Sequence, residues 1–157
     1  MVLGAPRTYQ KKFKFYVRLV DPDVGPVDAG FQSVSELSVE AAKVEHFEGG
    51  VVIPDKTPGR LTYSDVTLER GATGDAVLYN WMRQVGDAAF MGSEVVEPGY
   101  KRNLDIVQLD RSNKIMRLWR LYNAWPQKFV GGEWDNDSDE NVIESVTLSY
   151  DFFELIQ

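Results

Sequence analysis

The sequence predicts a mainly β protein: a small β-barrel or sandwich of six to seven strands with one flanking α-helix. Three observations predict it. Apolar and polar residues alternate with a period of two in several segments, which is typical of half-buried strands. Glycine, proline, asparagine and aspartate separate these segments as turns. One further segment has the apolar spacing of an amphipathic helix. Short strands joined by turns favour a barrel or a sandwich.

The strands are predicted in order along the chain. The first begins at Phe13, and its apolar face carries Phe13, Phe15, Val17 and Leu19. Later strands are predicted at 31–45, 61–70, 104–109, 115–123 with a continuation at 127–130, and 142–152. Trp125-Pro126 is expected to break the run before that continuation. Residues 110–114 are the predicted turn of a hairpin.

One helix is predicted from four apolar residues at helical spacing. They form a single stripe expected to pack on the core, namely Leu78, Trp81, Met82 and Val85. Thr73 or Asp75 can cap its start. Gly86 lies where the stripe ends and is expected to be a C-terminal stop or a weak spot, with a loop over 86–100.

Composition excludes several classes of function. The chain has 157 residues and no cysteine, which excludes disulfides, thiolate nucleophiles and zinc-thiolate sites. A net charge of -7, from 24 acidic and 17 basic residues, disfavours a dedicated nucleic-acid binder. No apolar run is long enough to span a bilayer, and the N-terminus lacks the apolar core of a secretory signal. We therefore expect folding in the cytoplasm and no membrane anchoring.

We expect one domain over residues 1–157, with residues 1–12 as an N-terminal arm. No catalytic constellation is predicted, so we expect no enzyme activity, no cofactor and no metal. His46 is the only histidine and is interpreted as a surface or interface residue. The acidic segment 135–140 does not fit a calcium loop, because Glu140 and Val146 stand where glycine and glutamate are needed. The segment 71–75 lacks the lysine of a phosphate-binding loop.

Four blocks of sequence stand out by their order and spacing. The first is Phe13–Val17 with Gly30–Ser38; the second is Glu45–Gly50 with Lys56–Arg60; the third is Val66–Gly71 followed by Leu78 and Trp81; the fourth is Arg120–Pro126 with Ile143–Leu148. Together they resemble the tail tube family of contractile phages and extracellular contractile injection systems. The departures are Glu36, where those proteins usually have glycine, and Thr57, where leucine is common.

This resemblance implies a β-barrel flanked by one helix and shared with the type VI secretion tube protein Hcp. It implies a structural protein whose hexameric rings stack into the rigid inner tube of a phage tail or phage tail-like particle. The implied partners are copies of the chain, the surrounding sheath, the baseplate, the tube initiator or terminator, and DNA or effector cargo in the lumen. The implied location is the cytoplasm during assembly, then a virion or released particle. The alternatives are a tube initiator or baseplate-proximal paralogue and, from another class, a monomeric ligand-binding β-barrel that uses its tryptophans.

A long connection is predicted over 46–59, and the loop from Glu45 to Arg60 is the expected contact between stacked rings. Its expected contact residues are Glu48, Gly49, Gly50, Val51, Val52, Ile53, Pro54, Lys56, Pro58, Gly59 and Arg60. The run Val51–Ile53 is apolar, and a solitary loop should not expose it, so a partner surface is expected to cover it. The alternative is that this run packs on its own barrel. The arm at 1–12 is a second candidate contact. Which strand residues face the lumen stays open.

Overall fold

The computed structural model describes residues 14–21, 25–72, 74, 76–91 and 99–157. The predicted arm at 1–12 and the two candidate cap residues, Thr73 and Asp75, lie outside this range. The described residues form ten strands and one helix, which confirms the mainly β fold with a single helix. All strand pairs in the described sheets are antiparallel.

The larger sheet follows one path of strands in the order β2-β1-β7-β8-β9-β6-β3, with β10 also paired to β8. Its first half contains β2 (Gly25–Ala29), β1 (Phe15–Asp21), β7 (Arg102–Leu109) and β10 (Phe152–Leu155). Its second half contains β9 (Ile143–Ser149), β6 (Val66–Gly71) and the short β3 (Ser33–Val34). The long strand β8 (Ile115–Val130) belongs to both halves.

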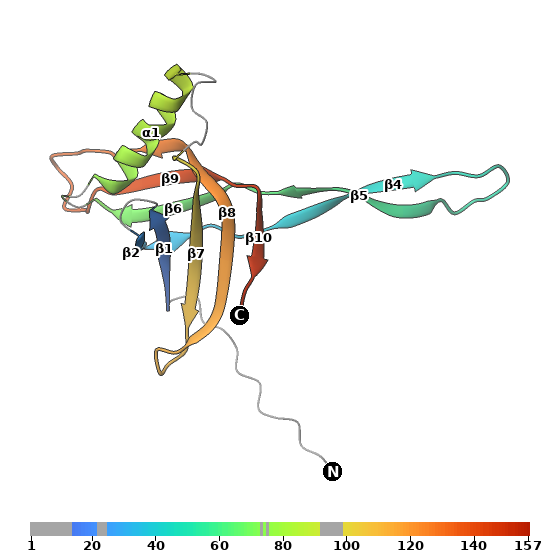
Figure 1. The fold of residues 1–157 in the computed structure, drawn as a ribbon, viewed down its shortest axis with the longest axis horizontal. Helices are drawn as coiled ribbons and strands as arrows, with labels where there is room; N and C mark the ends of the chain where they lie inside the picture. Colours follow the sequence, from blue (N-terminus) through green and yellow to red (C-terminus); the bar gives the residue numbers. More distant parts are fainter. Residues whose placement is uncertain (1–13, 22–24, 73, 75, 92–98) are drawn as a thin grey trace, which may run out of the picture.

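Strand β8 changes partner along its length. Residues 115–124 pair with β7, and residues 125–130 pair with β9. The bend coincides with Asn123, whose φ is 55°, and with a register shift between Pro126 and Lys128. Figure 1 shows β8 curving between the two halves. The break predicted at Trp125-Pro126 is therefore wrong: the strand continues and exchanges one neighbour for another.

The sheet folds over a core formed by the inward faces of its two halves. Alternation along β6 and β9 places every second residue inward, which explains why these strands bury apolar side chains while their flanking residues stay half-buried. The core contains Val17, Leu19, Val66, Leu68, Leu78, Trp81, Leu104, Leu121, Val146 and Leu148. The sheet does not close into a barrel, because β2 and β3 end its path unpaired with each other. The sandwich alternative describes the fold.

Helix α1 (Val77–Met91) packs over β8. It continues past Gly86, so the predicted stop there is wrong; a glycine inside a helix costs only about 1 kcal/mol relative to alanine. Leu78 and Trp81 hold the helix to the core from its first turns. The Trp81 indole donates a hydrogen bond of 2.6 Å to the Tyr100 carbonyl. Met82 and Val85 are half-buried on the same side.

Strands β4 (Val39–His46) and β5 (Asp55–Tyr63) form a separate two-stranded sheet. Figure 1 shows this hairpin extending well beyond the rest of the molecule. The strands outnumber the predicted six to seven for four reasons. Strand β2 forms at 25–29, where no strand was predicted. The stretch 31–45 divides into β3 and β4, and the stretch 61–70 divides between the end of β5 and β6, with β5 also occupying part of the expected loop. The last predicted strand divides at Tyr150–Asp151 into β9 and β10.

Candidate functional site

The β4–β5 hairpin exposes almost its whole surface. All eight residues of β4 are exposed, as are all but two of the nine residues of β5. An isolated two-stranded hairpin is marginally stable at best in water, since it buries little apolar surface. Beyond its base, the hairpin therefore lacks a packing partner among the described residues of its own chain.

The tip of the hairpin, residues 47–54, is apolar and open to solvent. Val52 is 93% exposed and Ile53 is 77% exposed, and the side chains of Phe47 and Val51 are exposed as well. The backbone turns at Gly50, whose φ of 86° favours glycine. The Val51 amide donates a hydrogen bond of 3.1 Å to the Glu48 carbonyl and closes the turn. Contiguous exposed apolar patches of this kind are typical of interaction surfaces.

Polar and aromatic contacts fasten the base of the hairpin to the body. The Ser38 hydroxyl donates to the Ser64 hydroxyl at 2.7 Å, and the Ser64 amide donates to the Ser38 carbonyl at 3.1 Å. At the end of β5, the Tyr63 ring packs edge-on against Phe153 at 5.2 Å and Tyr150 at 6.2 Å between centroids. The hairpin is thus anchored at one end and free at the other.

The predicted contact residues divide between the tip and β5. Glu48 to Pro54 lie at the tip, whereas Lys56, Pro58, Gly59 and Arg60 lie in β5. The prediction of one long loop over 46–59 is wrong, because Lys56 and Pro58 pair with Glu45 and Lys43 of β4. Pro58 is tolerated because this two-stranded sheet consists of edge strands. Gly59 lies close to β4: an added Cβ would lie 3.1 Å from the Val44 side chain, tighter than most such contacts.

Sequence reasoning missed an apolar groove at the base of the hairpin. Its walls come from several segments distant in sequence, and the apolar residues lining it are Phe15, Val34, Leu37, Val39, Ile106, Trp119 and Phe153. Each of these was visible as an apolar position in an extended segment. No sequence signal shows that these residues line one groove. Their proximity depends on how the strands that carry them are arranged in the folded chain.

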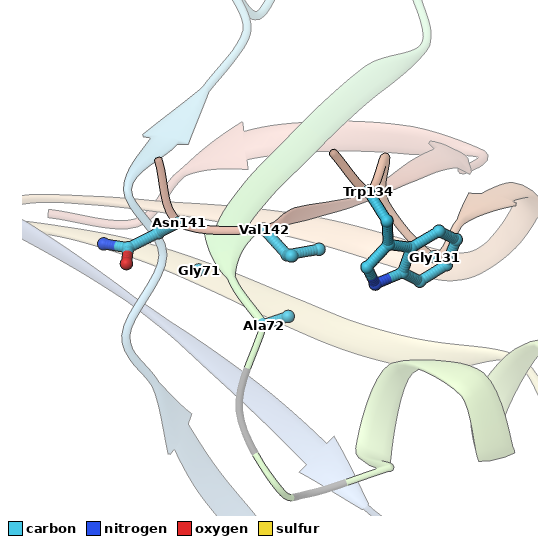
Figure 2. Close-up of a pocket in the computed structure, with 6 residues that line it drawn as sticks. All are labelled: Gly71, Ala72, Gly131, Trp134, Asn141 and Val142. Carbon is cyan, nitrogen blue, oxygen red and sulfur yellow. The ribbon is translucent and has the colours of Figure 1, made fainter. Parts of the chain in front are cut away.

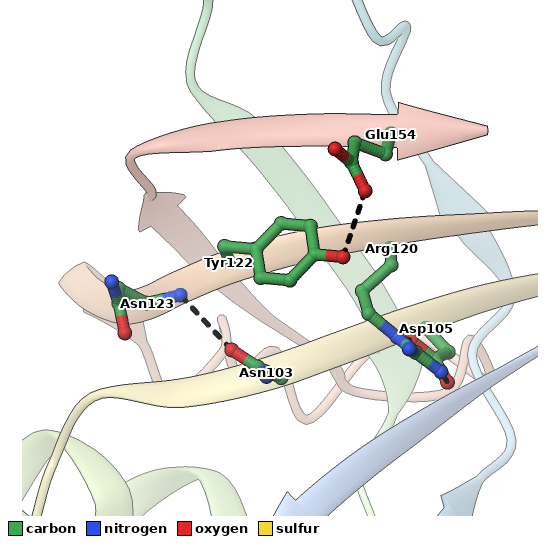
Figure 3. Close-up of polar contacts among 6 residues, drawn as sticks. All are labelled: Asn103, Asp105, Arg120, Tyr122, Asn123 and Glu154. Atoms are coloured by element: carbon green, nitrogen blue, oxygen red, sulfur yellow. Dashed lines mark hydrogen bonds and ion pairs between the residues drawn. The ribbon is translucent and has the colours of Figure 1, made fainter. Parts of the chain in front are cut away.

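A row of alternating charges crosses the outer face of the sheet. The register places Arg18 of β1 beside Asp105 of β7, Asp105 beside Arg120 of β8, and Arg120 beside Glu154 of β10. Glu154 accepts a hydrogen bond of 2.9 Å from the Tyr122 hydroxyl (Figure 3). The Arg120 guanidinium donates a hydrogen bond of 2.8 Å to the Asp105 carboxylate. This bond raises the pKa of Arg120 above its ordinary value. Opposite charges in adjacent cross-strand positions stabilise the sheet.

A second hollow lies beside the β8–β9 connection. Figure 2 shows the residues that line it: Gly71, Ala72, Gly131, Trp134, Asn141 and Val142. Their side chains include no acid or base, so this lining offers no group for proton transfer. Trp134 is exposed at its edge.

The single histidine of the chain lies where β4 meets the tip of the hairpin. His46 is exposed at the end of β4, opposite Asp55. In the ranges that the structure describes, no group of three or more His, Cys, Asp or Glu side chains is arranged to hold a metal ion. No helix in the described part of the chain combines the length and apolar character that crossing a bilayer requires.

The described residues form a two-halved β-sandwich with one helix and a hairpin whose apolar tip is open to solvent. The chain matches the model of the family "T4-like virus tail tube protein gp19" over residues 11–154 and belongs to that family. The resemblance drawn from the sequence blocks is confirmed. The family consists of structural tube proteins.

Several solved structures have the same fold. A chain in the cryo-EM structure of the anti-feeding prophage (AFP) baseplate has a TM-score of 0.78 at 22% identity, covering 98% of this chain and 97% of that chain. A chain in the extended sheath/tube terminator of PVC, an extracellular contractile injection system, has a TM-score of 0.79 at 22% identity, with 98% and 100% covered. Hcp1 from Flavobacterium johnsoniae has a TM-score of 0.58 at 16% identity, with 92% and 95% covered. The comparison with curated proteins found no match.

Proposed function

We propose that this chain is a structural subunit that forms hexameric rings, and that the rings stack into the rigid inner tube of a contractile phage tail or phage tail-like injection particle. The observation that carries the proposal is the free β4–β5 hairpin with its exposed apolar tip. Membership in the tail tube family supports it. The chain acts as a single domain and catalyses no reaction; its work is binding to copies of itself.

The proposed contact between rings is the tip together with the adjoining part of β5. The tip exposes four apolar side chains, and burying each would contribute roughly 1.5–3 kcal/mol. Contacts repeated around a ring would add to one another through effective concentration, so that a modest contact per subunit suffices for a stable tube. In contrast, the helix stripe is proposed to act within the subunit, as part of its core.

The proposed partners follow from this role. The chain would bind itself within and between rings, a sheath around the tube, and the baseplate and tube-initiating or terminating proteins at its ends. The AFP and PVC structures, described as baseplate, cap and sheath/tube assemblies, support these partners. DNA or an effector protein would occupy the lumen. Assembly would start in the cytoplasm, and the finished tube would leave in a virion or a released particle.

Electron microscopy of the purified protein tests the proposal. The wild-type chain should form rings or hollow rods. Val52→Asp should leave the subunit folded and abolish long tubes, because the contact would bury an unpaired charge. Val52→Ile keeps the apolar side chain and should assemble normally. A wild-type protein that remains monomeric at high concentration would contradict the proposal and favour a monomeric ligand-binding protein. Copy number in purified particles separates a main tube subunit from an initiator.

A further inference from the structure

The apolar groove at the hairpin base continues the core to the surface. Its wall residues pack against the buried core on one side and remain partly exposed on the other, as for Phe15, Leu37, Trp119 and Phe153. The groove has a volume of about 670 Å³. Trp119 and Phe153 meet edge-on at 5.5 Å between ring centroids and form a rigid aromatic wall. An aromatic groove of this kind fits an apolar peptide segment.

The chain cannot fill this groove with its own hairpin tip. Val39 lines the groove and begins β4, and the eight residues of β4 then extend away from the body (Figure 1). At about 3.3 Å per residue, the tip lies about 25 Å from its own groove. Any tip found in the groove must therefore come from a second copy of the chain.

The tip and the groove are both mainly apolar. Residues 47–54 carry one charged side chain, that of Glu48. Glu36 is the one charged residue among those lining the groove. Burial of apolar surface is therefore the driving force that we expect for their contact.

We propose that the hairpin tip of one copy, residues 47–54, docks in the apolar groove of a second copy. The inference rests on the proposed self-assembly and names the acceptor surface for it. Each chain carries one tip and one groove, which lie on different parts of its surface. Such a contact is heterologous, so each occupied groove leaves a new free tip and the assembly propagates.

Disulfide trapping tests the pairing directly, because the chain has no cysteine of its own. Val52→Cys places a thiol on the tip, and Glu36→Cys places one on the groove lining. Disulfides need Cα atoms within about 7 Å, so the separation of about 25 Å within one chain allows these thiols to join only between copies. The two single variants are mixed, assembled and oxidised. In the matched control, Val52→Cys is mixed with Asp137→Cys in place of Glu36→Cys. Asp137 is exposed in the β8–β9 connection, away from the groove lining.

The expected result is a covalent dimer of Val52→Cys with Glu36→Cys, formed about tenfold more than with Asp137→Cys, because docking raises the effective concentration of the thiols. A variant carrying both cysteines should give a ladder of longer covalent oligomers. Rings or tubes that form normally without this preference would overturn the groove assignment and leave the proposed function standing. A wild-type chain that forms no rings or tubes would overturn both.

Discussion

Asp105 of β7 binds the guanidinium of Arg120 on the neighbouring strand β8 through two hydrogen bonds. They measure 2.8 Å from Arg120 Nε and 3.1 Å from Nη2 (Figure 3). The Asp105 side chain is 7% exposed, whereas that of Arg120 is 36% exposed. The pair is therefore asymmetric. The buried Asp105 carboxylate relies on Arg120 for its hydrogen bonds, whereas the Arg120 guanidinium is also hydrated by solvent.

Asp105→Ala should lower the free energy of unfolding of the subunit by about 1–3 kcal/mol. The change removes two charge-assisted hydrogen bonds, but the half-exposed Arg120 can turn toward water and recover part of its hydration. Urea unfolding of the subunit measures the loss. Asp151→Ala, at an exposed acceptor of a hydrogen bond from Asn123, is the matched control and should cost less. Equal losses for the two variants would contradict the role assigned to burial.

Glu144→Ala should destabilise the subunit more than Asp105→Ala, by about 3–5 kcal/mol. Glu144 accepts a hydrogen bond from Arg70 on the paired strand, and both side chains are buried. Removing the carboxylate leaves a buried guanidinium without this counter-charge, and water cannot replace it easily. Urea unfolding of both variants under the same conditions ranks them. A smaller loss for Glu144→Ala would show that exposure does not control the strength of these pairs.

Trp81→Ala should cost about 3–5 kcal/mol of subunit stability, since it empties the largest fully buried side chain of the described core. The substitution also removes the hydrogen bond from the indole to the Tyr100 carbonyl. In addition, it removes the aromatic ring that the Arg102 guanidinium contacts at 5.3 Å from the ring centre. Trp81→Phe keeps much of the ring and should cost less. Thermal unfolding measures both, and an unchanged melting curve for Trp81→Ala would place the helix stripe outside the core.

Gly132→Ala should destabilise the connection between β8 and β9 by about 1–3 kcal/mol, whereas Gly131→Ala should be nearly neutral. Gly132 has a φ of 124°, and an added Cβ would lie 2.3 Å from the Val142 side chain. At Gly131 the nearest atom lies at 3.7 Å, an ordinary contact. Hydrogen exchange of the Ala72 amide, which donates to the Val142 carbonyl, reports local opening. Equal protection in both variants would contradict this prediction.

Stability should fall at alkaline pH through Tyr150. Burial raises the pKa of Tyr150 above its ordinary value of 10.0. The folded subunit therefore keeps this proton at a pH where the unfolded chain has lost it. The stabilisation is fully present below pH 10.0 and is lost as the pH rises through the folded-state pKa. Tyr150→Phe should reduce the alkaline loss in urea unfolding measured against pH. The same slope in both proteins would contradict the assignment.

Much of the fold was predictable from local pattern. Period-two alternation reports which face of a strand is buried, so the strands with one inward face, such as β6 and β9, were found. The stripe from Leu78 to Val85 located α1. Four short blocks of sequence, in the right order, were enough to indicate the family. The apolar run Val51–Ile53 stood out within the predicted loop, and the structure places it, exposed, at the hairpin tip.

Other features depended on tertiary structure. The sequence did not predict that β5 begins at Asp55, because no apolar alternation marks a hairpin with two exposed faces. It did not predict the path of β8 through Pro126, where a strand exchanges β7 for β9 as its neighbour.

The sequence by itself determined the strand faces, the helix, the family and the apolar tip, because each depends on residues close together in the chain. Only the tertiary structure decided that the sheet stays open as a sandwich, that Arg18, Asp105, Arg120 and Glu154 form one row, and that Phe15, Trp119 and Phe153 surround a groove. The physical reason is register. Side chains distant in sequence become neighbours through backbone pairing between strands, and local periodicity does not specify which strands pair.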